Sequence, residues 1–98
     1  MNTVNLTHEA LALSSPWKSK IIGKAGGANV KVLRMDASSY PNEVHDFVEA
    51  LLVLDGHMNL EIGGRTVCVQ AGEVFIVPAG QPHAVATGSR GTLVIIDQ

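Results

Sequence analysis

GEVFIVPAGQPH, residues 72–83, is the most informative stretch of the sequence about the fold. Five residues with strand character, 73–77, run directly into a turn that contains two prolines and a glycine. Each proline fixes its own φ angle and restricts the residue before it. Gly80 supplies a backbone conformation that other residues adopt only at a cost. The turn is therefore stiff, and we expect it to hold His83 at the start of the next strand.

Short strands separated by Gly and Pro turns cover most of the chain. The Asp55-Gly56 and Gly63-Gly64 pairs are both typical of turns, and the second predicts a two-residue hairpin. The predicted strands are residues 30–35, 50–54, 58–62, 65–70, 73–77, 83–87 and 92–96. Strands about ten residues apart are typical of an antiparallel sandwich or barrel. The predicted fold class is therefore all-β, with a small antiparallel barrel.

The N-terminal part of the chain is predicted to differ from the rest. Residues 8–13 are predicted to form a short N-terminal helix that Thr7 can cap, and Ser14-Ser15-Pro16 ends it. Residues 23–27 are glycine-rich and predict a surface loop. We expect one domain over residues 1–98, with an N-terminal segment at 1–27 and a barrel core at 28–98.

Composition excludes several classes of function. A net charge of −2 and scattered basic residues argue against a nucleic-acid or anionic-membrane surface. The longest apolar run, residues 50–54, is far too short to cross a bilayer. The N-terminus lacks the pattern of a signal peptide, so we expect a cytoplasmic protein. The single cysteine, Cys68, lies in a predicted strand and is expected to be a reduced core residue.

A polar cluster at residues 43–49 complements the histidine of the stiff turn. Alternation places His83 on one face of its strand with Val85, and if that face is interior the imidazole needs hydrogen-bond partners or a metal. Glu49 precedes an apolar strand, where an unpaired carboxylate is costly. A cation that binds His45, Glu49 and His83 together would satisfy all three side chains.

These residues resemble the two sequence signatures of the cupin family. Gly72, Pro78, Gly80 and His83 have the spacing of the second signature. The family usually ends this signature with an asparagine, and Thr87 stands at that position here. The chain is also similar to small one-domain bacterial cupins along its whole length.

The first cupin signature is matched in part. His45, Glu49 and Gly56 match its second histidine, its glutamate and its glycine, if the loop before Glu49 is one residue shorter than usual. Glu43 occupies the place of the first histidine, and Ala37 replaces a usual glycine.

The resemblance implies a six-coordinate metal site and a small-molecule function. Cupins hold a first-row metal with three histidines and a glutamate, and here His45, Glu49 and His83 are the candidate ligands, with Glu43 as a fourth. Two histidines and a carboxylate can hold Fe(II) with open positions, and Mn, Ni and Zn are equally compatible. Family members include dioxygenases, isomerases, decarboxylases and sugar-modifying enzymes.

Three functions follow as expectations from this resemblance. The first is a small-molecule site at the barrel mouth, centred on a divalent metal, and it leaves open whether the protein is an enzyme. The alternative is a non-catalytic small-molecule-binding cupin with a degenerate metal site. The third is a barrel retained for dimerisation with a partner.

Other residues give weaker indications about the ligand and the assembly. His57 is expected to be exposed, and His8 has no partner in the sequence. Aromatic side chains either line the pocket or belong to the core; they are Tyr40, Phe47 and Phe75. Arg34 and Arg65 are the only arginines near core strands. The apparent lack of basic residues at the mouth favours a neutral or mostly apolar ligand.

A homodimer is expected from two features. Trp17 lies in a segment that must pack on something, and in related cupins such segments cover the barrel or cross to a second subunit. The apolar run at residues 50–54 has one face for the barrel and one that needs cover, which a second subunit or a helix can supply.

Overall fold

The computed structural model describes residues 3–98. It contains one helix and eight strands, in the order α1 (Leu6–Ala12), β1 (Lys20–Ala25), β2 (Ala28–Asp36), β3 (Tyr40–Glu43), β4 (Glu49–Ile62), β5 (Arg65–Gln70), β6 (Val74–Val77), β7 (His83–Val85) and β8 (Arg90–Asp97). No helix within the described part of the chain is both long enough and apolar enough to cross a membrane.

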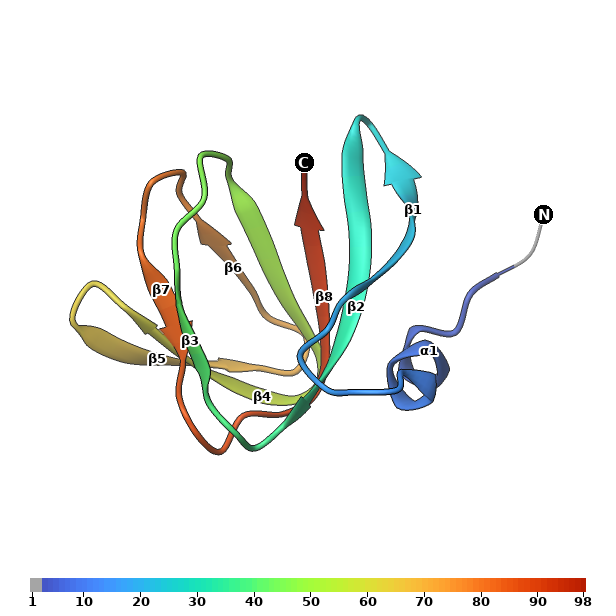
Figure 1. Cartoon of the computed structure of the whole chain (residues 1–98), viewed down its shortest axis with the longest axis horizontal. Coiled ribbons are helices and arrows are strands. Elements are labelled where there is room, and N and C mark those ends of the chain that lie inside the picture. Colours follow the sequence, from blue (N-terminus) through green and yellow to red (C-terminus); the bar gives the residue numbers. More distant parts are fainter. Residues whose placement is uncertain (1–2) are drawn as a thin grey trace.

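The strands form one curled antiparallel sheet. Its hydrogen-bonded order is β1-β2-β8-β4-β7-β3, and β5 and β6 both pair with β4. Figure 1 shows the strands curving around a common interior, with α1 outside them. This arrangement is a jelly-roll of the cupin type, which confirms the predicted all-β barrel with a short N-terminal helix.

Strand β4 is the longest element and corrects the predicted turn at Asp55-Gly56. The chain does not reverse there: its 14 residues form one bent strand. The pairing with β8 shifts register between Val53 and Asp55. Gly56 has a φ of 76°, and a Cβ atom there would lie 1.9 Å from the carbonyl oxygen of Arg90. The glycine therefore permits a close crossing of two strands, where the sequence pattern suggested a reversal.

The sequence pattern missed two strands, β1 and β3, and correctly predicted the hairpin between β4 and β5. Only Gly26 and Gly27 form the turn in the predicted loop at 23–27, because the residues before them belong to β1. Strand β3 contains Pro41, which is tolerated because β3 lies at the edge of the sheet. The Gly63-Gly64 hairpin is confirmed, with positive φ at both glycines.

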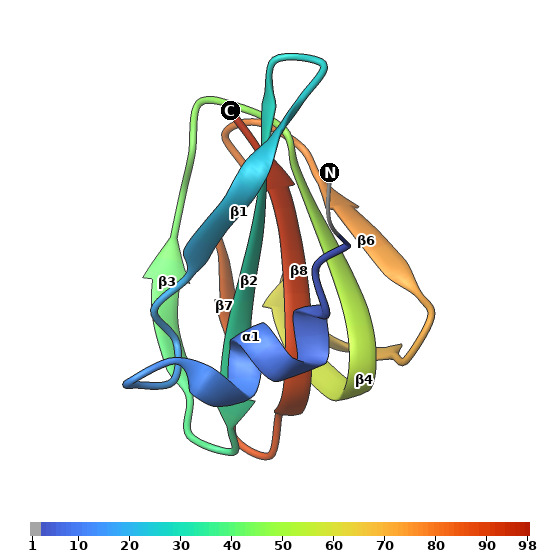
Figure 2. The same ribbon diagram turned by 90° about the vertical axis from the view of Figure 1, so that its right-hand side faces the viewer.

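The helix begins earlier than predicted and has a different cap. Asn5, rather than Thr7, is the N-cap, and its side-chain oxygen accepts a hydrogen bond from the backbone amide of His8 at 3.0 Å. The Arg34 guanidinium donates to the carbonyl oxygens of Ala10 (2.7 Å) and Leu13 (3.1 Å) at the other end. Figure 2 shows α1 lying across β2 and β8.

Alternation along the strands separates the core from the outer face. Inward side chains from β2, β4 and β8 form the centre of the core, including Leu33, Leu51, Val53 and Leu93. Cys68 is exposed, which corrects its predicted place in the core: Val69 beside it points inward, so the cysteine points out.

His57 is half-buried, which differs from the expectation that it is exposed. It lies inside a strand, between Gln70 on one side and Arg90 on the other, and no turn precedes it.

Candidate metal centre

The stiff turn at residues 78–82 positions two histidines. His83 is the first residue of β7, where it pairs with Ile62 of β4 and Glu43 of β3. The turn also contacts the loop before β4, since the backbone amide of Gly80 donates a hydrogen bond to the carbonyl oxygen of His45 at 2.7 Å. Gly80 has a φ of 78°, which is a conformation that favours glycine. One rigid segment thus fixes both imidazole-bearing stretches of backbone.

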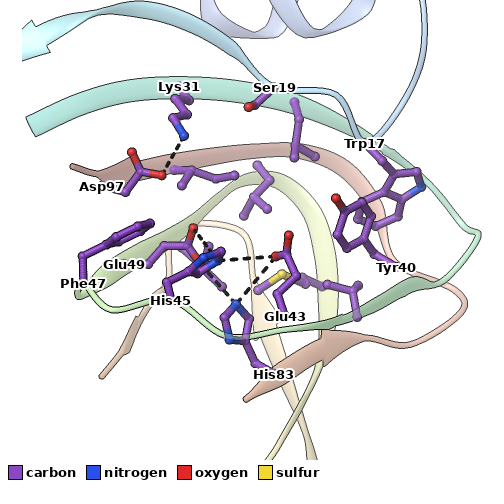
Figure 3. Close-up of a pocket in the computed structure, with 16 residues that line it drawn as sticks. Trp17, Ser19, Lys31, Tyr40, Glu43, His45, Phe47, Glu49, His83 and Asp97 are labelled. Carbon is purple, nitrogen blue, oxygen red and sulfur yellow. Dashed lines mark hydrogen bonds and ion pairs between the residues drawn. The ribbon is translucent and has the colours of Figure 1, made fainter. Parts of the chain in front are cut away.

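The four predicted side chains converge at the mouth of the barrel. His83 Nε2 lies 3.2 Å from Oε1 of Glu49 and 3.9 Å from Oε2 of Glu43. His45 Nε2 lies 3.6 Å from the same Glu43 oxygen and 3.8 Å from Oε2 of Glu49. Figure 3 shows both imidazoles directed at the two carboxylates. Glu43, His45 and His83 each offer a ligand atom within 4.8 Å of the other two, which makes them a possible metal-binding group.

The tautomer of His83 suits a metal ligand. Its Nδ1 lies 3.0 Å from the carbonyl oxygen of Gln81, which can only accept a hydrogen bond. Nδ1 therefore carries the proton, and in a neutral imidazole Nε2 presents its lone pair to the carboxylates. Such a hydrogen bond from the second nitrogen is usual for histidines that bind metals.

Both Nε2 atoms are buried without a hydrogen-bond partner among residues 3–98. The 3.2 Å contact between His83 and Glu49 lacks hydrogen-bond geometry. Buried polar nitrogens without a partner are costly, and so are buried carboxylates without a cation. A cation between them would remove both costs, so this chain's own residues fit a divalent metal.

The ring of His45 is held by its neighbour. It stacks on Phe47, with ring centroids 4.8 Å apart and an interplanar angle of 11°. The centroids of the two imidazoles are 5.5 Å apart. Stacking limits rotation of the His45 ring and keeps Nε2 directed into the site.

Burial controls the electrostatics of Glu49. The side chain is almost fully buried, and loss of water raises its pKa above the usual value. The two nearby imidazoles lower the pKa in part, whereas the charges of Glu43 and Asp97 raise it further. The pKa of Tyr40 is also raised, chiefly by the charge of Glu43. Loss of water is thus the largest cause of the raised pKa of Glu49.

A cavity of about 180 Å³ adjoins these side chains. Tyr40 and Phe47 line it, as one of the two readings of the sequence proposed, whereas Phe75 packs against the core. Trp17 also lines the cavity, and its indole N–H donates to Asp36 (2.6 Å) and to Ser38 (2.8 Å). The remaining walls are mostly apolar, from Leu33, Leu51, Met58, Val85, Leu93 and Ile95.

The cavity also contains a basic residue that the sequence interpretation did not place there. Lys31 lines it together with Asp97, and Lys31 Nζ lies 2.7 Å from Oδ2 of that carboxylate. The expected lack of lysine or arginine at the mouth was therefore wrong. Alternation places Lys31 on the same face as Leu33, which is buried, and this is the signal in the strand pattern for the inward position of Lys31. The two arginines noted near core strands do not reach the cavity: Arg34 hydrogen-bonds to the carbonyl oxygen of Ala10 in α1, and Arg65 is exposed.

Comparison with known proteins agrees with the fold. A family model described as a cupin domain matches residues 32–97, about two thirds of the chain. The chain therefore belongs to the cupin-domain family. No curated protein sequence matches it.

Solved structures with the same fold include proteins of different description. A cupin-2 domain containing protein from Shewanella frigidimarina has a TM-score of 0.85 and 19% identity, over 95% of this chain and 91% of that one. A protein from Neisseria meningitidis has a TM-score of 0.83 and 23% identity, over 98% of both chains. The DMSP lyase from Ruegeria pomeroyi has a TM-score of 0.72 and 22% identity, over 85% of this chain and 47% of that one. At these identities the similarity concerns the fold alone.

Proposed function

We propose that the protein binds a divalent transition metal through Glu43, His45, Glu49 and His83 and uses it to hold a small oxygen-bearing molecule in the adjoining cavity. The observation that carries this proposal is the pair of buried, unpartnered Nε2 atoms facing two carboxylates. A mixed nitrogen and oxygen ligand set suits Fe, Mn, Ni or Zn. A bound metal would act as a Lewis acid that polarises an oxygen of the ligand.

This chain's own residues would orient and enclose the ligand. Leu51, Met58 and Leu93 supply apolar walls, while Trp17 and Tyr40 lie side by side in the cavity wall, with ring centroids 5.6 Å apart. A cavity of about 150 Å³ is known to hold a benzene molecule. The 180 Å³ found here therefore favours a small metabolite over a nucleotide or a peptide.

In one form of this proposal the protein is an enzyme that uses the metal in catalysis. Glu43 favours a second form, in which the protein binds the ligand without converting it. Two ionised carboxylates would neutralise a divalent cation and weaken its ability to polarise a substrate. A non-catalytic binding module would tolerate such a neutral centre. The two forms differ in one measurement, because only the enzyme converts a ligand that binds to the metal-loaded protein into a product.

The proposal includes a cytoplasmic homodimer. Leu54, Val74 and Ile76 are exposed apolar side chains on the outer face of the sheet, beside the area that α1 covers. Exposed apolar side chains on neighbouring strands suit an interface with a second copy. The single cysteine cannot form an internal disulfide, which suits a reducing compartment.

Metal content provides the test. Protein purified without a polyhistidine tag is reconstituted with Mn²⁺, Fe²⁺, Ni²⁺ or Zn²⁺, desalted, and analysed by mass spectrometry for metal per chain. We expect about one equivalent of at least one metal, which is lost in His83→Ala and kept in the matched variant His57→Ala. Less than about a tenth of an equivalent of every metal in the wild-type protein would reject the proposal.

A further inference from the structure

Two carboxylates lie next to each other at the open end of the barrel. Ala50 of β4 pairs with Ile96 of β8, so the next residues along these antiparallel strands, Glu49 and Asp97, both point inward. Both side chains are almost fully buried. They interact, since the charge of Asp97 is one of the causes that raise the pKa of Glu49.

One of these two carboxylates, that of Asp97, has an ammonium group beside it. Asp97 Oδ2 accepts from Lys31 Nζ at 2.7 Å, and its Oδ1 accepts from the side-chain amide of Asn29 at 3.3 Å. Glu49 faces the imidazoles of His45 and His83. Figure 3 shows Lys31 and Asp97 on the same side of the cavity as Glu49.

Lys31 retains hydrogen-bonding capacity toward the cavity. An ammonium group has three N–H donors, and Asp97 is its one hydrogen-bond acceptor among residues 3–98. The side chain is 23% exposed and lines the cavity, whereas that of Asp97 is 3% exposed. The neighbouring walls are apolar, from Leu33 and Ile95. A charge in such surroundings interacts more strongly with an opposite charge than it would in water.

A purely structural role does not account for this ion pair. Strands β2 and β8 are already joined by a continuous ladder from Asn29↔Asp97 to Asp36↔Arg90. A buried ion pair adds little stability compared with apolar side chains of the same volume. The pair therefore costs desolvation at a place where the backbone ladder already holds the two strands together.

The charges around the cavity favour an anion once a metal is present. Glu43, Glu49 and Asp97 contribute −3 when ionised and Lys31 contributes +1, which leaves −2 with neutral histidines. A divalent cation brings the sum to zero, so a monoanion is no longer repelled. Lys31 is then the one ammonium or guanidinium in the described cavity wall that can bind it.

We propose that Lys31 is a specificity-determining residue that binds the carboxylate of a short organic acid. The acid's hydroxyl or carbonyl oxygen would lie toward Glu43, His45, Glu49 and His83. This inference rests on the proposed metal site. A cavity of 180 Å³ limits the acid to about six to eight non-hydrogen atoms, by comparison with benzene in a cavity of about 150 Å³. The ligand class is thus a short hydroxy or keto acid, which replaces the neutral ligand favoured by the sequence.

The test compares lactate with propane-1,2-diol, which has the same carbon skeleton without the carboxylate. Mn²⁺ is titrated first, without any organic ligand, into the wild type and Lys31→Met; each ligand is then titrated into the Mn²⁺-loaded proteins by calorimetry. We expect lactate to bind the wild type at least about tenfold more tightly than the diol. Lys31→Met should lose about tenfold in lactate affinity, while its Mn²⁺ affinity stays within about threefold.

A second variant guards against misfolding from an unpaired Asp97. Lys31→Met combined with Asp97→Asn removes both charges and should show the same loss of lactate affinity, whereas Lys31→Arg should retain most of it. Equal lactate affinity in the wild type and both methionine variants would overturn the inference, as would equal affinity of the wild type for lactate and the diol. A wild type that binds no Mn²⁺ would instead show that the proposed metal site itself is wrong.

Discussion

The backbone amide of Gly80 donates a hydrogen bond of 2.7 Å to the carbonyl oxygen of His45. This bond joins the proline-rich turn that leads to His83 with the loop that carries the other imidazole. The two histidines are 38 positions apart in the sequence, yet one backbone contact fixes the positions of the segments that carry them relative to each other. The stiffness of the turn therefore pre-organises the candidate centre before any ligand binds.

Replacing Gly80 with alanine should disturb both stability and metal binding. The residue has a φ of 78° and open space around it, so an added methyl group causes backbone strain of about 1–2 kcal/mol without a clash. Relaxation of that strain would move the His45 carbonyl, and we expect metal affinity to fall about tenfold. Calorimetric titration and thermal unfolding measure the two effects.

Gly63→Ala is the matched control for this change. Gly63 has a φ of 60°, also with nothing within contact distance, but it lies in the β4–β5 hairpin. It should lose similar stability and keep the metal affinity of the wild type. If both alanine variants bind metal equally well, the turn does not position the site.

Gly56→Ala should be far more damaging than Gly72→Ala. A Cβ at position 56 would lie 1.9 Å from the Arg90 carbonyl oxygen, and this oxygen belongs to backbone that cannot easily move. We expect a loss of more than about 3 kcal/mol in the free energy of unfolding. Gly72 has a φ of 85° and free space, so its substitution should cost only about 1–2 kcal/mol of strain. Similar denaturant midpoints for the two variants would contradict the close crossing of β4 and β8.

Glu49→Gln should stabilise the metal-free protein at neutral pH. Burial raises the pKa of Glu49 in the folded state. The stabilising contribution of its protonated form is therefore complete below the unfolded pKa and is lost as the pH rises through the folded pKa. Above that window the wild type carries a buried charge that the glutamine variant lacks, so the melting temperature of the variant should be higher.

The same substitution should weaken metal binding, and wild-type affinity should rise with pH. Burial favours the protonated form of Glu49, so a metal must displace that proton in order to bind. Metal binding should therefore release a proton at pH values between the unfolded pKa of Glu49 and its raised folded pKa. Calorimetry in buffers of different ionisation enthalpy measures that release. A Glu49→Gln protein with unchanged metal affinity would exclude this carboxylate as a ligand.

Ile76→Lys should convert the proposed homodimer to monomers. The side chain is 53% exposed on the outer face of β6, so the monomer loses little when a charge replaces it. A buried lysine in an apolar interface is costly, and we expect dissociation at micromolar concentration. Light scattering after gel filtration gives the mass of each form. A monomeric wild-type protein would contradict the proposed homodimer.

The sequence predicted those features that depend on local chemistry. The Pro-Gly-Pro turn restricts its own backbone, and alternation placed His83 on the same face as Val85, which the structure shows to be buried. Gly63-Gly64 likewise specified its hairpin. No local rule joins His45, Glu49 and His83, and their convergence was predicted from the cost of burying their polar groups and from the family signatures.

Other features depend on contacts that the sequence does not reveal. Gly56 reads as a turn residue, but the approach of β8 determines its role. Val32 is buried on the outer face of β2, because α1 contacts this strand. Both faces of β2 therefore carry buried apolar residues, and the pattern of apolar residues alone does not show which face Lys31 shares. Because the inward position of Lys31 was not recognised, the sequence favoured a neutral ligand.

The most direct measurement is an anomalous difference map from crystals of the Mn²⁺-reconstituted protein. The account predicts one strong peak per chain, at about 2.0–2.3 Å from His45 Nε2, His83 Nε2 and a carboxylate oxygen of Glu49. A map without that peak, in which His83 Nε2 instead donates a hydrogen bond directly to Glu49, would contradict the account.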